Sequence, residues 1–357
     1  MTTFLKTSLR VLLAAGTVAV TAATAFADTF TLRIGAGHPA TLPYVSELEG
    51  FFVPEVKRRV EAETEHRVKF VEAYGGSVAK LPEVFEATES GLLDFGAMAT
   101  TFEPSALFLN NYGFQTPFGV GDPVRAGEIA RQLYDQFPEL PAQVQAHNQH
   151  PLAVMASSNY NIITTEPWET LADLEGRKIM AGGPNLAWLT ATSATPVQGS
   201  LGDAYNGMQT GVYDGMLIHY QGMAGFKLHE VAPYIARIDF GSMPINLLNV
   251  NADRWEGLPE NVRGIISEVA LAYEARVNQA NADRDATVVQ AMVDAGATLL
   301  DIAPDVRAAW AQGAVDVPKA AAMDGDSRGL PSSLVIGAYI EILKAEGSEA
   351  AQAYSLQ

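Results

Sequence analysis

The segment GAGHPA, at residues 35–40, is the first pattern in the chain whose residue types and spacing could bind a cofactor. It follows an apolar run and fits the glycine-rich turn that holds a dinucleotide pyrophosphate at the start of a helix. Pro39, however, lacks the backbone N–H that such a helix start offers to phosphate. The nearest acidic residue on the next strand, Glu72, lies too far along it. We therefore interpret the segment as a turn and expect no nucleotide cofactor.

The histidines do not form a metal-binding or catalytic motif. None of the six belongs to an H-E-x-x-H pattern, and no carboxylate stands at helical spacing beside His147 and His150, which we interpret as a solvated pair. The chain has no cysteine, which excludes disulfides, thiolate metal sites and cysteine nucleophiles. No G-x-S-x-G elbow occurs in a supportive context. The sequence therefore predicts a protein that is not an enzyme and has no cofactor and no metal site.

Aromatic, amide and imidazole side chains stand instead near the ends of predicted strands. Pockets for small ligands combine apolar walls with a few placed polar groups. We expect a ligand-binding site built from His38, Tyr74, Phe102, Glu103, Asn159, Tyr160, Asn161, Met180, Trp188, Leu201, Asp203, Ile218 and His219. Comparable positions are held by Tyr44, Asn185, Gln198 and Tyr205. Each side chain taken singly also fits a core or surface role, so the prediction depends on their grouping.

Two βαβαβ units must position these residues. The first has strands at 30–34, 68–73 and 93–98, with helices at 45–63 and about 81–90. The second has strands at 162–165, 177–181, 195–198 and 214–218, with helices at 186–192 and 201–210. This alternation predicts an α/β protein with two lobes, each a parallel sheet flanked by helices, which bind ligands at the carboxyl ends of the strands. A helical stretch from 259 to 296 is long enough to brace both lobes.

The start of the chain has the features of a secretory signal peptide. Lys6 and Arg10 precede the apolar run 11–23, and the residues at 25–27 form a small-x-small cleavage site. An uncleaved anchor would need a longer apolar run. We therefore expect cleavage after Ala27, a mature chain in the periplasm, and no later segment that spans a bilayer.

The net charge excludes one class of partner. The 357 residues include 23 basic and 41 acidic side chains, which gives a net charge of −18. A surface of this sign repels nucleic acid and anionic lipid, so we expect no nucleic-acid partner. It says nothing about a small ligand, because the ligand is exposed only to the local field of its pocket.

Three motifs follow one another in the middle of the chain. Residues 171–179 have the sequence LADLEGRKI, residues 194–197 ATPV and residues 203–215 DAYNGMQTGVYDG. Weaker matches are GLLD at 91–94, PF at 117–118 and the segment 251–259. In this order the chain resembles the substrate-binding proteins of tripartite ATP-independent periplasmic (TRAP) transporters, over nearly the whole predicted mature chain.

The resemblance implies a two-lobed Venus-flytrap fold that closes by a hinge, with a long helix shared by both lobes. It also implies ion-gradient-driven uptake of a small-molecule ligand, two membrane-embedded partner subunits (one small and one large), and no catalysis. We expect the signal peptide at 1–27, the first lobe at 28–155 plus 242–284, and the second lobe at 156–241 plus 285–357. The alternatives are the receptor of an ATP-driven importer and a periplasmic enzyme on a doubly wound sheet.

The chain differs from the family at the positions whose basic side chains pair with the carboxylate of the ligand. Most members bind organic acids, and the resemblance implies an arginine directly after the KI of the first motif, where this chain has Met180. A second base often lies on the preceding strand, which here carries only Asn159, Tyr160 and Asn161. A buried carboxylate without a cationic partner costs several kcal/mol.

We therefore expect a neutral, zwitterionic or cationic ligand, such as an amino alcohol, a polyol or a betaine. Aromatic faces and an acidic group, Glu103 or Asp203, would hold an ammonium. The alternative is an ordinary organic acid, bound by Arg177, Lys178 or Lys80 turned into the cleft.

Overall fold

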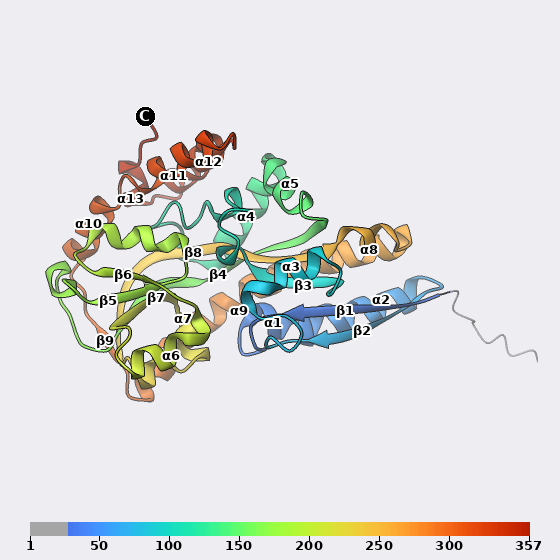
Figure 1. Ribbon diagram of the computed structural model, residues 1–357, viewed down its shortest axis with the longest axis horizontal. Coiled ribbons are helices and arrows are strands. Elements are labelled where there is room, and N and C mark those ends of the chain that lie inside the picture. Colours follow the sequence, from blue (N-terminus) through green and yellow to red (C-terminus); the bar gives the residue numbers. More distant parts are fainter. Residues whose placement is uncertain (1–27) are drawn as a thin grey trace, which may run out of the picture.

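The computed structural model describes residues 28–357, so the predicted signal peptide lies outside the described residues. The strands are β1 (Thr29–Ala36), β2 (Arg67–Ala73), β3 (Phe95–Ala99), β4 (Gln149–Thr164), β5 (Lys178–Ala181), β6 (Thr195–Gln198), β7 (Gly215–His219), β8 (Tyr234–Asn251) and β9 (Thr298–Leu300). They form a mixed sheet in the order β2-β1-β3-β8-β4-β7-β5-β6, with β9 beside β8 (Figure 1). The predicted α/β class is confirmed.

The first lobe consists of β1, β2, β3 and their helices. β1 pairs in parallel with β2 and β3, and α1 (Pro43–Glu47), a π-helix (Leu48–Phe52) and α2 (Val53–Glu63) connect β1 to β2. α3 (Val84–Glu89) connects β2 to β3. α2 buries Val53, Val56 and Val60, which lie on one face of the helix, in a core that includes Leu32 and Ile34 of β1. The predicted order of elements is confirmed here.

The second lobe consists of β5, β6, β7 and their helices. β5 pairs in parallel with β6 and β7, and α6 (Leu201–Gln209) and α7 (Tyr220–Gly225) flank β7 in the chain. The α-helix predicted at 186–192 is instead a 3₁₀ helix, Pro184–Ala191. The hydroxyls of Thr190 and Thr192, at the end of this segment, donate to the carbonyls three residues before them. These side-chain hydrogen bonds compete with the backbone hydrogen bonds of a regular α-helix.

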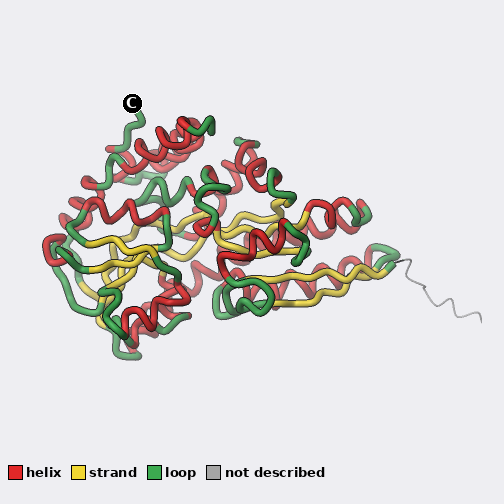
Figure 2. Tube along the Cα trace, in the orientation of Figure 1, coloured by secondary structure: helices red, strands yellow, loops and turns green. Residues whose placement is uncertain are grey.

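Two long strands join the lobes, and they correct the prediction of wholly parallel sheets. β4 and β8 run antiparallel to each other, and β8 pairs antiparallel with β3 while β4 pairs antiparallel with β7. Figure 2 shows them in yellow through the middle of the molecule. Both strands are buried on both faces, and the β4–β8 register shifts at four places. Neither strand therefore has the alternation that reveals a strand in the sequence.

The crossing between the lobes depends on one glycine of β8. Gly241 has φ +111°, and a Cβ there would lie about 3.0 Å from the backbone of Gly119. Only glycine combines this backbone angle with so close an approach. The position therefore requires glycine where β8 passes the segment that precedes α4 (Pro123–Gln136).

Helix α9 (Glu260–Asp294) is shared by both lobes, as predicted. Its first half buries Val262, Val269 and Val277 in the core of the first lobe. Its last turns bury Val289 and Met292 in the core of the second lobe. One rigid element thus contacts both halves of the molecule.

The remaining helices pack around this frame. They are α4 (Pro123–Gln136), α5 (Glu139–Gln145), α8 (Ala252–Glu256), α10 (Pro304–Gly313), α11 (Val317–Ser327), α12 (Ser332–Ala345) and α13 (Glu349–Ala353). Tyr339 and Tyr354 near the C-terminus share a third core with Leu133 of α4 and Leu140 of α5. The predicted lobe boundaries stay a prediction. None of the described helices is both long and apolar enough to cross a bilayer.

Candidate functional site

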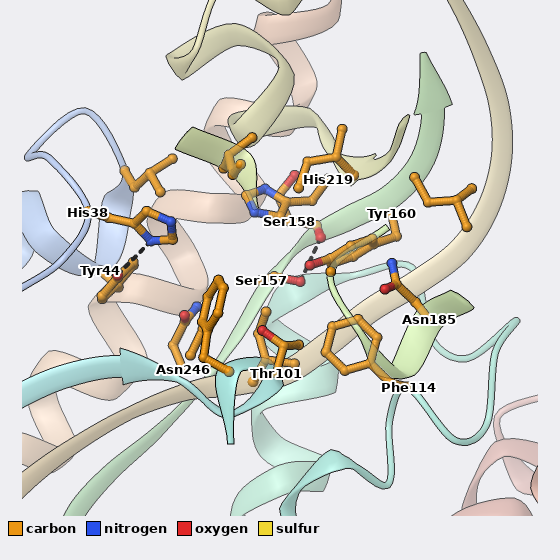
Figure 3. Close-up of a pocket in the computed structure, with 18 of the residues that line it drawn as sticks. His38, Tyr44, Thr101, Phe114, Ser157, Ser158, Tyr160, Asn185, His219 and Asn246 are labelled. Carbon is orange, nitrogen blue, oxygen red and sulfur yellow. Dashed lines mark hydrogen bonds between the residues drawn. The ribbon is translucent and has the colours of Figure 1, made fainter. Parts of the chain in front are cut away.

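A pocket of about 670 Å³, including its opening, lies between the two lobes at the carboxyl ends of β1, β3, β5 and β7 (Figure 3). Its lining residues are His38, Leu42, Pro43, Tyr44, Ala99, Thr101, Phe102, Phe114, Ser157, Ser158, Tyr160, Gly182, Asn185, Gly199, Leu201, Met216, Leu217, Ile218, His219, Ile245, Asn246 and Asn281. The strand ends therefore converge on one cavity.

Six of the residues expected to bind a ligand lie at this pocket. They are His38, Phe102, Tyr160, Leu201, Ile218 and His219. They come from loops after β1 and β3, from β4, from the start of α6 and from the end of β7. Tyr160 and His219 are register partners on neighbouring strands, and their ring centroids are 5.3 Å apart. That these residues bind a ligand stays a prediction.

Four other expected residues have structural contacts behind the pocket. Met180 and Trp188 are fully buried in the core of the second lobe. The Asn159 side chain donates to Asp239 and accepts from the backbone N–H of Gly241. None of the three lines the pocket.

Asn161, the fourth, satisfies backbone groups of β8. Its Oδ1 accepts hydrogen bonds from the N–H groups of Ile238 and Asp239, at 2.7 and 2.8 Å. These N–H groups lie where the β4–β8 register shifts, so the strands themselves leave them unpaired. An amide beside the predicted cleft was thus assigned to a ligand although it binds the protein's own backbone.

Replacement of Asn161 by alanine should lower the free energy of unfolding by about 2–4 kcal/mol, because it leaves one buried and one part-buried N–H group without an acceptor. Asn185→Ala is the matched variant, since Oδ1 of Asn185 is buried without a protein partner and its loss should affect stability less. Denaturant titration of both variants measures the difference. Equal stability losses would contradict this assignment.

The last three expected residues lie away from the pocket. Tyr74 packs at the edge of the first core and its hydroxyl donates to Glu72. Asp203 is exposed and accepts from the Ser200 hydroxyl. Burial raises the pKa of Glu103, which is half-buried but does not line the cavity. The structure therefore brings neither of the predicted acidic partners to the pocket.

Sequence reasoning missed several lining residues. Ser157 and Ser158 lie on β4, Asn246 on β8 and Asn281 on α9, and Phe114 lies in an irregular segment before α4. Only the end of β4 was recognised as a strand, and β8 was not recognised, so Ser157, Ser158 and Asn246 were not placed at the cleft. Tyr44 and Asn185 were noted in the sequence as possible cleft residues, and both line the pocket.

The pocket has no charged wall. None of the residues lining it in the described chain is Lys, Arg, Asp or Glu. Burial lowers the pKa of His38 to about 4, and burial, with a smaller contribution from His38, lowers that of His219 to about 3. Both imidazoles are therefore neutral at pH 7, so the pocket offers hydrogen bonds and aromatic faces. In the described residues, no three His, Asp or Glu side chains converge as metal ligands would.

One half-buried carboxylate connects the pocket to the shared helix. Asp285 of α9 accepts from the Ser158 hydroxyl at 2.5 Å, the Gln221 amide at 3.0 Å and the Asn159 N–H at 3.1 Å. Burial raises its pKa, against these hydrogen bonds. The contacts join β4, α7 and α9 at the β4 register shift between Ala156 and Asn159, which positions Ser158 at the pocket.

Comparison with known proteins agrees with this architecture. The family model described as bacterial extracellular solute-binding protein, family 7, matches residues 46–323. The ectoine-binding periplasmic protein TeaA of Halomonas elongata is 25% identical over 239 residues, 65% of this chain and 68% of that protein. The ectoine/5-hydroxyectoine-binding periplasmic protein UehA of Ruegeria pomeroyi is 25% identical over 238 residues, 64% of this chain and 67% of that protein.

A solved structure shows the same fold. A TRAP solute-binding protein from a marine metagenome, in complex with pyroglutamate, superposes with a TM-score of 0.77 at 16% identity. The match covers 88% of this chain and 99% of that one. This match confirms the two-lobed fold, and the family model confirms the resemblance to TRAP receptors. The chain belongs to family 7 of the bacterial extracellular solute-binding proteins, whose members are receptors and not enzymes and deliver small molecules to the membrane subunits of TRAP transporters.

Proposed function

We propose that this chain is the periplasmic receptor of a TRAP transporter and that it captures a small polar solute without net charge. The observation that carries the proposal is the absence of a charged side chain among the described residues that line the interlobe pocket. The predicted signal peptide at 1–27 supports export to the periplasm. The solute is released chemically unchanged.

The cations that could receive an organic acid are held elsewhere. Arg177 donates to the carbonyls of Glu166 and Pro167, and Lys178 donates to the carbonyl of Gly211. Lys80 is exposed and does not line the pocket. An organic anion would therefore be desolvated without a cationic partner, which costs several kcal/mol.

A cationic solute meets the same difficulty. Glu103 and Asp203, the predicted partners of an ammonium, do not line the cavity. Aromatic faces alone contribute about 0.5–2 kcal/mol to binding a cation, less than the desolvation cost. Of the three ligand classes expected from the sequence, those without net charge fit best: polyols and zwitterions such as betaines. The names of TeaA and UehA, which bind ectoine, support a zwitterion.

Thermal unfolding of the mature protein tests this proposal. A panel should include ectoine, glycine betaine, glycerol, choline and pyroglutamate. A net-neutral solute at about 100 times its Kd stabilises the folded state by about 2.7 kcal/mol, a rise in Tm on the order of 5 °C. Mass spectrometry of the solute that co-purifies identifies the natural ligand. Stabilisation by pyroglutamate alone, or a co-purified organic anion, would refute the proposed ligand class.

A further inference from the structure

We propose that the pocket is polarised and takes a zwitterion in one orientation. His38 and His219, from opposite lobes, donate two imidazole N–H groups to the ligand carboxylate, and the end lined by Tyr160, Phe114 and Asn185 receives its cationic group. This inference rests on the proposed function and specifies the chemical class of the solute.

The tautomer of His38 is set by Tyr44. Nδ1 of His38 lies 2.7 Å from the Tyr44 hydroxyl, and this buried hydroxyl has no other hydrogen-bond partner in the described chain. A buried hydroxyl must place its proton on an acceptor, so Tyr44 donates to Nδ1. The neutral ring then carries its proton on Nε2. Nε2 is buried without a protein partner and, in Figure 3, lies on the ring edge that faces the cavity.

The tautomer of His219 is set by the backbone. His219 is the N-cap of α7, and its Nδ1 accepts the N–H of Gly222 at 3.0 Å. Because a backbone N–H can only donate, Nδ1 is unprotonated and the neutral ring carries its proton on Nε2. Nε2 of His219 has no hydrogen-bond partner among the described residues. The ring is partly accessible to the cavity.

The two donors lie on opposite lobes and close to each other. His38 follows β1 in the first lobe, and His219 ends β7 in the second. The two rings lie near enough to each other that a charge on His38 lowers the pKa of His219. Two protonated rings would repel, whereas two neutral rings with inward N–H groups suit one shared acceptor. A carboxylate can accept from both rings at once, so its binding would draw the two lobes together.

The part of the cavity lined by Asn185, Phe114 and Tyr160 offers the complementary chemistry, and Tyr160 lies between it and His219, with ring centroids 5.3 Å apart. Oδ1 of Asn185, an acceptor, is buried without a partner. The rings of Phe114 and Tyr160 lie beside it (Figure 3), with centroids 5.4 Å apart. Aromatic faces and an amide oxygen attract a substituted ammonium. The distribution of donors at one end and acceptors at the other therefore defines the orientation of a zwitterion.

The inference is tested with variants that remove Nε2 but retain the structural contact of each ring. His38→Asn keeps a polar group near Tyr44, and His219→Asn keeps an acceptor at an N-cap, where asparagine is favoured. Calorimetric titration uses the zwitterion of the panel that most stabilises the wild type. We expect each variant to weaken binding about 10- to 100-fold, because each removes one hydrogen bond to a charged group. His38→Gln and His219→Gln, which place an amide N–H near Nε2, should retain more affinity than the Asn variants.

His150→Asn is the matched control, since His150 stacks on Trp255 outside the pocket; it should bind as the wild type does. Zwitterion affinities in both Asn variants equal to that of His150→Asn, or a best ligand that is a polyol without a carboxylate, would overturn this inference and leave the proposed function standing. If the wild-type protein bound no net-neutral solute, the proposed function itself would be refuted.

Discussion

Replacement of Trp188 by alanine is expected to lower the free energy of unfolding by about 3–5 kcal/mol, the usual cost of removing a buried aromatic side chain. Trp188 is completely buried, and its ring stacks on Phe240 with centroids 4.9 Å apart. Its Nε1 donates to the carbonyl of Phe114 at 2.7 Å. Losing that partner adds about 1 kcal/mol. Denaturant-induced unfolding of wild type and variant measures the sum.

The same substitution should weaken ligand binding, although Trp188 does not line the pocket. The hydrogen bond from Nε1 holds Phe114, whose ring forms part of the pocket wall. Trp188 also lies on the 3₁₀ turn that carries Asn185. Removing the indole therefore loosens two lining residues at once. We expect an affinity loss of about 10-fold or more, since small displacements at a site have large effects.

Trp310→Ala separates the two effects. Trp310 is also fully buried, and its Nε1 donates to the Trp188 carbonyl at 2.8 Å, but it has no contact with the pocket. Its loss should destabilise the fold to a similar extent and change the affinity of the folded protein much less. If Trp188→Ala, assayed where it is still folded, bound the ligand as tightly as the wild type, the indole would have no role in positioning the pocket wall.

The alternation of short strands and helices made most of the fold predictable. Segments such as 30–34 and 178–181 stand between glycine-rich turns and apolar helices, so their local pattern agrees with the tertiary structure. The long strands β4 and β8 were not predicted in full, because burial on both faces and register shifts remove their periodicity. The antiparallel junction between the lobes was therefore not foreseen.

The candidate site could be predicted only where a side chain follows a recognisable strand. His38 and His219 come directly after β1 and at the end of β7, and both line the pocket. Asn161 and Trp188 also lie beside predicted strand ends, but they point away from the cavity to satisfy backbone groups. Residue type cannot separate these cases, since the direction of a side chain depends on bulges and turns that the sequence does not reveal.

Met180→Arg is expected to change the charge class of the ligand. Met180 is fully buried on β5, with Val197 and Met216 as its register partners. Its Sδ lies beside Gly199, which lines the pocket, so a longer cationic side chain at 180 would reach the cavity. The resemblance to TRAP receptors implies an arginine at this position. The variant should gain at least 100-fold in its preference for pyroglutamate over the best zwitterion of the wild type, because a bidentate arginine compensates a buried carboxylate.

Without an anion the same variant should be less stable, since a buried cation that lacks a partner costs about 3–5 kcal/mol. Addition of pyroglutamate should restore its Tm, whereas the wild type should not respond. Met180→Leu, which nearly conserves side-chain volume, should retain zwitterion binding and gain no affinity for the anion. Calorimetric titration of the three proteins with both ligands decides the matter. An arginine variant that keeps the ligand preference of the wild type would show that residue 180 does not set it, and that the uncharged lining of the pocket is not what excludes organic anions.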